Sequence, residues 1–210
     1  MSAAGENIQP TRGELLKLKR RIDLAERGHE LLREKRDALI TEFFDNLSLL
    51  RERREKVDER LENAFEKLVK AKVTIGTLEL EEAAEVTKSK LEIDIDSRNI
   101  MGVKVPIIEA EGLERKNTER GYSIQQTSST LDEASKEFEK ALRDILELAE
   151  AEETVKQLAK NIEKTKRRVN SLEHILIPRL EDNRDYIEMR LEEQERETYF
   201  RLKRVKEKME

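Results

Sequence analysis

Apolar residues recur every three or four positions over two long parts of the chain, residues 11–73 and residues 123–209. This spacing gathers apolar side chains along one face of a helix, and charged residues occupy most of the other positions. At about 1.5 Å per residue the two helices would be roughly 95 and 130 Å long. The pattern therefore predicts a rod in which two amphipathic helices, folded back on each other, share one apolar seam.

The first helix has a clear start signal. Pro10 precedes the segment Thr11-Arg12-Gly13-Glu14, which has the form of a capping box. Two successive four-residue steps, from Leu32 to Arg36 to Ile40, predict a stutter that locally relaxes supercoiling. The helix should end near residues 74–76. Its expected seam runs through Leu15, Leu18, Ile22, Ala25, His29, Leu32, Arg36, Ile40, Phe43, Leu47, Leu50, Arg54, Val57, Leu61, Ala64 and Leu68.

The second long helix contains a proline, Pro178, which would cost roughly 3 kcal/mol in a helix interior. One interpretation ends a helix at Ile177 and begins another after it. The apolar period continues on both sides of Pro178, which favours one helix kinked there. The expected seam runs through Leu131, Ala134, Phe138, Ala141, Ile145, Leu148, Val155, Ile162, Val169, Leu172 and Leu176, then Leu180, Ile187, Leu191, Thr198, Leu202, Val205 and Met209.

The part between the two helices has a different pattern. Residues 77–87 predict a short helix, and residues 91–96 alternate apolar and acidic side chains, as a half-buried strand does. Residues 97–102 should turn, and residues 103–107 alternate again, with Pro106 restricted to a sheet edge. We expect a β-hairpin that leans on the rod or on a partner, followed by a loop over residues 109–121. The residues that define the hairpin are Ile93, Ile95, Met101, Gly102, Val103 and Pro106.

The expected fold is therefore mainly α: a long antiparallel two-helix coiled coil formed by the N- and C-terminal helices, with a short central helix and a β-hairpin. We divide the chain into an N-terminal tail (1–10), an N-terminal shaft helix (11–73), a central part with the short helix, hairpin and loop (74–121), and a C-terminal shaft helix (122–210).

Composition supports this architecture. Charged residues make up 42% of the chain and aromatic residues 4%, with no Cys and no Trp. Too few apolar residues are present for a thick core, but they suffice for a seam between two helices. The lack of Cys excludes disulfides and thiolate metal sites. No apolar run approaches 18 residues and no signal peptide is evident, so we expect no membrane insertion.

The charge is unevenly distributed. The net charge of the chain is −5, yet residues 11–21 carry +4 and residues 198–210 carry +3. In an antiparallel pair both basic segments would meet at one tip. This tip is either a solvated end or a surface that faces an acidic partner. Its candidate residues are Arg12, Lys17, Lys19, Arg20, Arg201, Lys203 and Arg204.

The sequence contains no motif for catalysis or for nucleotide binding. The phosphate-binding and zinc-protease motifs are absent, and His29 and His174 are far apart in sequence. His29 is expected to pack in the seam. The acidic side chains of residues 92, 94 and 96 are more simply a solvated strand face than a cation site. We therefore expect a protein without catalytic residues, metal or cofactor.

Several segments resemble the D subunit of the archaeal (A-type) and vacuolar-type rotary ATPases. The N-terminal part contributes residues 10–19, 28–32 and 35–39, and the hairpin contributes Met-Gly-Val at 101–103 and Val-Pro at 105–106. The stronger likeness is C-terminal: Arg-Val-Asn-Ser-Leu-Glu-His at 168–174, Ile-Pro-Arg-Leu-Glu at 177–181 and Tyr-Ile at 186–187, completed by 195–197 and 201–203. The likeness covers nearly the whole chain in the correct order, but residues 77–90 carry no matching motif.

The resemblance implies a non-catalytic central-stalk protein that acts as a rotor shaft. Its implied partners are the catalytic A and B subunits, the F subunit of the stalk, and the C subunit (called d in vacuolar enzymes), a socket that joins the proteolipid ring. The shaft would couple ATP synthesis or hydrolysis to the transport of protons or sodium ions, at the cytoplasmic face of the membrane. The basic tip would then face the catalytic ring.

Two other classes of function fit parts of the pattern. A coiled-coil tether or chaperone-like hairpin requires only the apolar period. A nucleic-acid binder would use the basic tip, but it should also offer base-stacking aromatic residues, of which the tip has only Tyr199 and Phe200.

Overall fold

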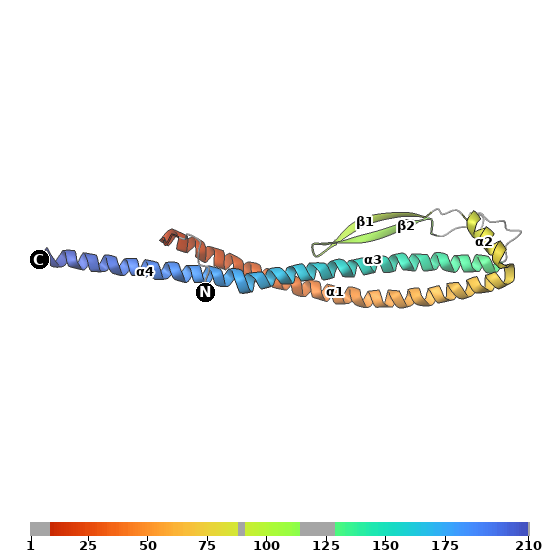
Figure 1. The fold of residues 1–210 in the computed structure, drawn as a ribbon, viewed down its shortest axis with the longest axis horizontal. Helices are drawn as coiled ribbons and strands as arrows, with labels where there is room; N and C mark the ends of the chain where they lie inside the picture. Colours follow the sequence, from red (N-terminus) through yellow and green to blue (C-terminus); the bar gives the residue numbers. More distant parts are fainter. Residues whose placement is uncertain (1–8, 88–90, 114–128, 210) are drawn as a thin grey trace. The chain divides into compact units, whose positions relative to one another are not determined.

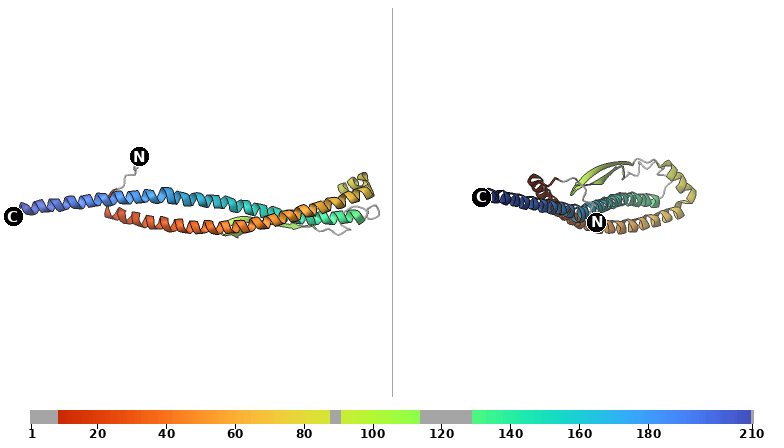
Figure 2. Two further views of the ribbon diagram at one scale, coloured as in Figure 1. Left: turned by 90° about the horizontal axis from the view of Figure 1, so that it is seen from below. Right: turned by 60° about the vertical axis from the view of Figure 1, so that its left-hand side comes forward.

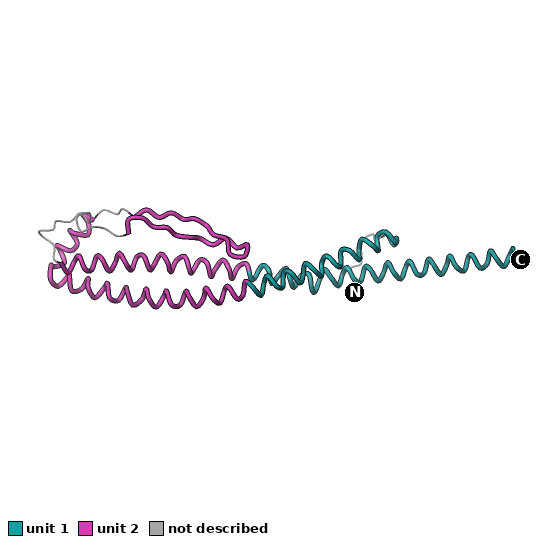
Figure 3. The backbone as a smooth tube through the Cα atoms, turned by 180° about the vertical axis from the view of Figure 1, so that it is seen from behind, with its two compact units in different colours: residues 1–38, 162–210 teal, residues 39–161 magenta. Residues whose placement is uncertain are grey.

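The computed structural model describes residues 9–87, 91–113 and 129–209. In chain order the elements are α1 (Arg12–Ile75), α2 (Thr77–Val86), β1 (Glu92–Ile100), β2 (Val103–Glu111), α3 (Ser129–Ser171), the π-helical turn η2 (Leu172–Leu176) and α4 (Ile177–Glu207) (Figure 1). The expected fold class, mainly helical with one short helix and a β-hairpin, is confirmed. The chain divides into unit 1, residues 1–38 and 162–210, and unit 2, residues 39–161 (Figure 3).

Helix α1 begins where the capping box predicts. The backbone N–H of Glu14 donates to Oγ1 of Thr11 at 3.2 Å, which satisfies one of the free amide groups of the first turn. The Glu14 carboxylate pairs with Lys17 at 3.1 Å. The predicted start is therefore correct, and the helix ends at Ile75, just before Gly76, whose φ of 104° suits glycine.

In unit 1 the first part of α1 runs alongside η2 and α4 in the opposite direction (Figures 1 and 2). Residue numbers rise on α1 as they fall on the other helix in the ion pairs Arg12–Glu195 and Lys19–Glu188 and in the contact between His29 and Glu173. The expected antiparallel pairing is confirmed here. As expected, His29 lies within the seam, with its side chain 19% exposed and Nε2 3.5 Å from Glu173 Oε2.

In unit 2 the second part of α1 pairs with α3, again antiparallel (Figure 1). The rings of Phe65 and Phe138 meet edge to face at 5.4 Å. Fully buried apolar side chains occupy two positions of a seven-residue repeat, three or four residues apart, as in coiled coils. They include Leu39, Ala64 and Ala71 on α1, and Ala134, Ala141 and Leu158 on α3.

The expected seam differs from the observed one at several positions. Leu39 is buried and Ile40 only partly, so the steps after Leu32 are four and three residues, and the predicted stutter at Arg36 is wrong. Arg54 is exposed, where the seam was expected to include it. On α3 the buried positions are Asp144 and Thr154, where Ile145 and Val155 were expected. In both α3 cases an apolar residue is adjacent to the polar residue that the helix geometry buries.

A row of charged residues therefore enters the seam of unit 2. Lys56 Nζ donates to Asp144 Oδ1 at 2.8 Å, and Arg60 Nε lies 2.9 Å from Oδ2. The Asp144 side chain is only 6% exposed. Further along α1, Lys67 Nζ lies 3.3 Å from Oε1 of Glu137. Hydrogen bonds from Lys140 and Lys67 hold the pKa of Glu137 below its ordinary value against the opposing effect of burial.

The hairpin turns more tightly than the sequence predicts. Strand β1 continues to Ile100, so the turn expected within residues 97–102 is confined to Met101 and Gly102, which have φ of 51° and 86°. Two successive residues at positive φ form the type of turn that matches strand twist. Asn99 Oδ1 accepts a hydrogen bond from the Gly102 amide at 2.7 Å.

The expected alternation of buried and exposed residues holds in β2 but not in β1. Val103 and Val105 are 3% and 1% exposed, whereas Ile93 and Ile95 are 48% and 67% exposed. Arg98, which pairs with Val105 across the strands, reaches Glu150 of α3 at 3.6 Å within the same unit. The hairpin therefore leans on α3 through β2 and Arg98.

Strand β2 also extends beyond the predicted end at residue 107. It includes Pro106, which pairs with Ser97 at a position not hydrogen-bonded across the hairpin, and continues to Glu111. The missing amide of Pro106 therefore costs the ladder no bond. Of the loop expected over residues 109–121, the first three residues are strand, and residues 114–121 lie outside the described residues. So does the expected start of the second long helix before Ser129.

The helical backbone continues through Pro178, as the unbroken apolar period predicts. The turn before it is a π-helix, in which the Ile177 amide bonds to the Leu172 carbonyl, one residue further back than in an α-helix. Such a turn moves backbone carbonyls out of the α-helical line, which relieves the clash of a proline ring with the preceding turn. The sequence predicted continuity but not this turn.

Pro178 offers a test of that explanation. Pro178→Ala restores a backbone donor at an exposed position and should raise the melting temperature of the isolated chain. The gain should be smaller than the roughly 3 kcal/mol of an unrelieved helix proline, because the π-helical turn already absorbs part of the strain. Thermal unfolding followed by circular dichroism measures it. An unchanged or lower melting temperature would contradict strain at this turn.

The buried charges of unit 2 generate a second prediction. Asp144→Ala should destabilise the chain by about 1.5–3 kcal/mol, because the buried carboxylate loses its charged contacts with Lys56 and Arg60, whose own side chains are partly exposed and can be solvated. Glu152→Ala, an exposed change on the same helix, should stay within about 0.5 kcal/mol. Joint replacement of Lys56 and Arg60 by Met and of Asp144 by Leu should recover most of the loss. Urea unfolding distinguishes these outcomes, and equal stability of the Asp144 and Glu152 variants would contradict the role of the buried charges.

Candidate functional site

The end of α4 extends past the start of its partner helix. Arg12, the first residue of α1, pairs with Glu195, whereas α4 continues to Glu207. We call residues 196–207 the tail helix. The ion pairs that its residues make within the described chain, Arg196–Glu192 and Arg201–Glu197, stay inside α4.

Seam positions of the tail helix are consequently exposed. The sequence predicts that the seam continues through Thr198, Leu202, Val205 and Met209, but all four side chains are exposed, Leu202 by 64% and Val205 by 55%. Burial of these residues within the chain is thus a wrong prediction. Among the described residues, α1 offers no helical position opposite them, because it begins at Arg12, which pairs with Glu195.

The tail helix also presents two aromatic rings and a shallow groove. Tyr199 and Phe200 are 69% and 62% exposed, and their ring centres lie 6.4 Å apart. A groove of about 430 Å³ follows the start of α1 and this part of α4. It is lined by Arg12, Leu191, Gln194, Glu195, Thr198, Tyr199 and Leu202.

The predicted basic residues lie at one end of unit 1 in two groups. On α1, Lys19 pairs with Glu188 at 2.7 Å and Lys17 with Glu14. On the tail helix, Arg201 pairs with Glu197, one turn back at 3.2 Å. The structure therefore neutralises part of the α1 group, and it leaves the tail group, which includes Lys203 and Arg204, beyond the start of α1.

Charge is segregated between the two units. Among the described residues, unit 1 has 22 Lys and Arg against 17 Asp and Glu, a net +5, and unit 2 has 15 against 26, a net −11. The sequence indicated basic ends, and the division into units shows that the excess of negative charge belongs to unit 2. The other predicted site residues lie elsewhere: Pro178 follows η2, and the hairpin residues are in unit 2.

Sequence reasoning missed Asp144, although a signal was present. Every seventh residue of α3 after Glu137, at positions 144, 151 and 158, is buried in the structure. The adjacent Ile145 was chosen because apolar residues are the usual occupants of a seam.

The described residues contain no arrangement of the kind that holds a metal ion, since no group of three or more His, Cys, Asp or Glu side chains converges among them. None of the helices in the described ranges is long and apolar enough to span a membrane. An antiparallel helical pair with a hairpin and an exposed, charged terminal helix belongs to the class of structural and interaction proteins.

Comparison with known proteins makes this class specific. The family model for the D subunit of ATP synthase matches residues 14–207, and the chain belongs to that family. A relative from Pyrococcus horikoshii is 55% identical over 203 residues, covering 95% of this chain and 93% of its own. One from Methanopyrus kandleri is 52% identical over 205 residues, covering 98% and 88%. A third, from Methanobrevibacter smithii, is 48% identical over 205 residues, covering 98% and 89%. Each of the three is the D subunit of an A-type ATP synthase.

Proposed function

We propose that this protein is the central-stalk subunit, the rotor shaft, of an A/V-type rotary ATPase. It would couple ATP synthesis or hydrolysis in a ring of A and B subunits to the transport of protons or sodium ions through the membrane ring. Membership of the D-subunit family carries the proposal, together with the tail helix, whose exposed seam residues find no partner within the described chain. Such a surface is completed by other proteins.

The tail helix and its neighbours in unit 1 would meet the catalytic A and B subunits. A single shaft inside a ring of three similar sites presents a different face to each site, and differential contact can favour a different conformation in each. The net +5 of unit 1 supports an acidic partner surface, and exposed charge pairs there would be weak enough to exchange as the shaft turns.

Unit 2 would meet the remaining stalk subunits. The chain folds back at Gly76 between α1 and α2, and the hairpin follows. We assign this part to the F subunit and to the socket-forming C subunit, which link the stalk to the membrane ring. The protein would thus be a peripheral part of a membrane complex at its cytoplasmic face.

We also propose that the protein has no catalytic role of its own. The sequence has no phosphate-binding loop, and the two histidines of unit 1, His29 and His174, are a seam residue and an exposed residue of the π-helical turn. Nucleotide chemistry would belong to the A and B subunits.

Charge reversal in the tail helix tests the ring contact. Changing Arg201, Lys203 and Arg204 to Glu should weaken binding to the A and B ring by roughly 3- to 150-fold, since each exposed pair contributes about 0.2–1 kcal/mol. The effect should shrink as salt is raised. The matched control reverses three exposed basic residues at the end of α3, Lys164, Lys166 and Arg168. Equal weakening by both triple variants would contradict a specific role for the tail.

Removal of the hairpin completes this experiment. Replacing residues 92–111 by a short Gly-Ser linker should leave ring binding intact and reduce coupling between ATP hydrolysis and ion transport in the assembled enzyme. Loss of ring binding in the hairpin variant, together with normal binding of the tail variant, would reverse the assignment of partners.

A further inference from the structure

Unit 2 has an apolar surface outside its seam. We call it the Phe65 face. Its α1 residues are spaced four and three apart, and so are its α3 residues, so each set lies along one side of its helix. The ring contact between Phe65 and Phe138 joins the two sets. The members are Leu61, Phe65 and Leu68 on α1, and Phe138, Leu142 and Ile145 on α3.

The Phe65 face remains open in this chain although it is apolar. The side chain of Phe65 is 54% exposed, and Leu142 and Ile145 are 37% and 36% exposed. The seam is already filled by neighbouring residues of both helices, such as Ala64 and Ala141. Helix geometry therefore leaves the Phe65 face as a second stripe, whose three residues the described part of the chain covers only in part.

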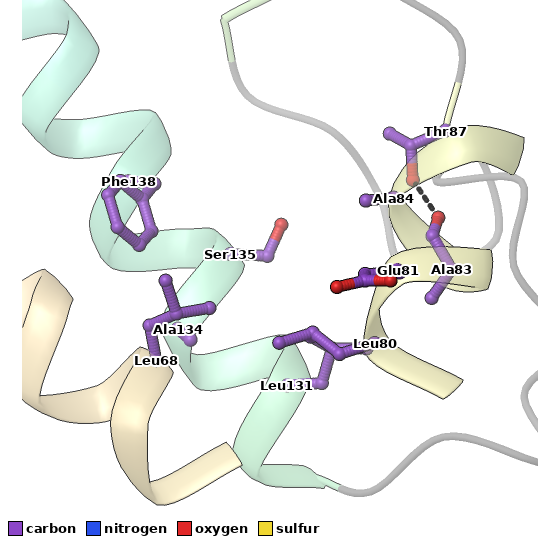
Figure 4. A pocket seen from close by; sticks show the side chains of 10 residues that line it. All are labelled: Leu68, Leu80, Glu81, Ala83, Ala84, Thr87, Leu131, Ala134, Ser135 and Phe138. Atoms are coloured by element: carbon purple, nitrogen blue, oxygen red, sulfur yellow. Dashed lines mark hydrogen bonds between the residues drawn. The ribbon is translucent and has the colours of Figure 1, made fainter. Parts of the chain in front are cut away.

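A pocket of about 490 Å³ continues the Phe65 face toward α2. Leu68 and Phe138 belong both to the face and to the wall of the pocket, whose apolar lining also includes Leu131, Leu80 and three alanines (Figure 4). Leu80 and Ala84 of α2 lie opposite α3 across this space. No residue of α2 is fully buried, so the short helix does not fill the space beneath it.

The short helix that covers the pocket is strongly acidic. Helix α2 carries four carboxylates, of Glu79, Glu81, Glu82 and Glu85, and no basic residue. The neighbouring end of α1 is mixed, since Glu62 and Glu66 are followed by three lysines within residues 67–72. Together with the net −11 of unit 2, the carboxylates of α2 repel phosphate groups, so a nucleic acid or an anionic lipid surface does not suit this site.

We propose that the Phe65 face and its pocket are a docking site for a basic, amphipathic helix of another protein, which inserts an apolar side chain beneath α2. Aromatic and aliphatic anchors in a pocket are the usual source of affinity in such contacts, and a rim of opposite charge steers the partner. The inference rests on the proposed function in one respect: the occupant is a different protein of the ATPase and not a second copy of this chain.

The test measures binding of the full-length chain to three separate probes: the purified F subunit, the purified C subunit and the A and B ring. Phe65→Asp should raise the Kd for one of the two purified subunits at least tenfold. The matched control is Phe44→Asp, because Phe44 is a similarly exposed phenylalanine of α1 in unit 2 that lies outside the Phe65 face, at 60% exposure. It should leave the same Kd unchanged.

A second variant tests the acidic rim without changing a residue that lines the pocket. Glu82→Lys combined with Glu85→Lys, two exposed positions of α2, should weaken the same complex at low salt and lose this effect at high salt. Unchanged Kd values for both purified subunits with both variants, or an effect confined to the A and B ring, would overturn the docking site, even if the tail-helix experiment still supports the rotor role. A shift confined to self-association, seen by analytical ultracentrifugation, would overturn the choice of occupant.

Discussion

The seven-residue seam between antiparallel helices is the constraint on which the rest of the structure depends. Each residue of a two-helix seam needs to pack on one side only. A chain that is 42% charged can therefore still bury a continuous row of side chains. Within each unit the ion pairs follow the same antiparallel register as the buried residues. In unit 2, Arg60 and Asp144 occupy seam positions themselves, where a shift of register would leave a buried charge without its partner.

The seam also explains where the chain keeps surfaces for other proteins. It ends where α1 begins, at Arg12, so the seam residues of the tail helix remain uncovered. In unit 2 the seam is filled, and the exposed Phe65 lies beside it on a second stripe. Unit 1 is net positive and suits an acidic partner, whereas unit 2 is net negative and suits a basic partner. This division agrees with the proposed function, in which one unit contacts the catalytic ring and the other contacts membrane-side proteins.

Much of the fold follows from the sequence alone, because long helices repeat the same signal many times. The start at Thr11, the short helix, the hairpin and the continuity through Pro178 are all predicted correctly. The sequence predicts the wrong buried residue where either of two neighbouring residues could occupy the seam, as at Leu39 and Ile40 or at Asp144 and Ile145. At Asp144 the helical repeat, and not apolar character, decides which residue is buried. The turn at Met101 and Gly102 is shorter than predicted because the polar residues before it are typical of loops in composition, although they pair along β1.

The central claim is that the tail helix lacks a partner in the isolated chain and acquires one in the assembled ATPase. Amide hydrogen exchange, followed by mass spectrometry on the isolated chain and on the assembled complex, tests it directly. The account predicts rapid exchange over residues 196–207 in the isolated chain and strong protection in the complex, while the seam around Leu158 is protected in both. Equally rapid exchange of the tail helix in both states would contradict the account.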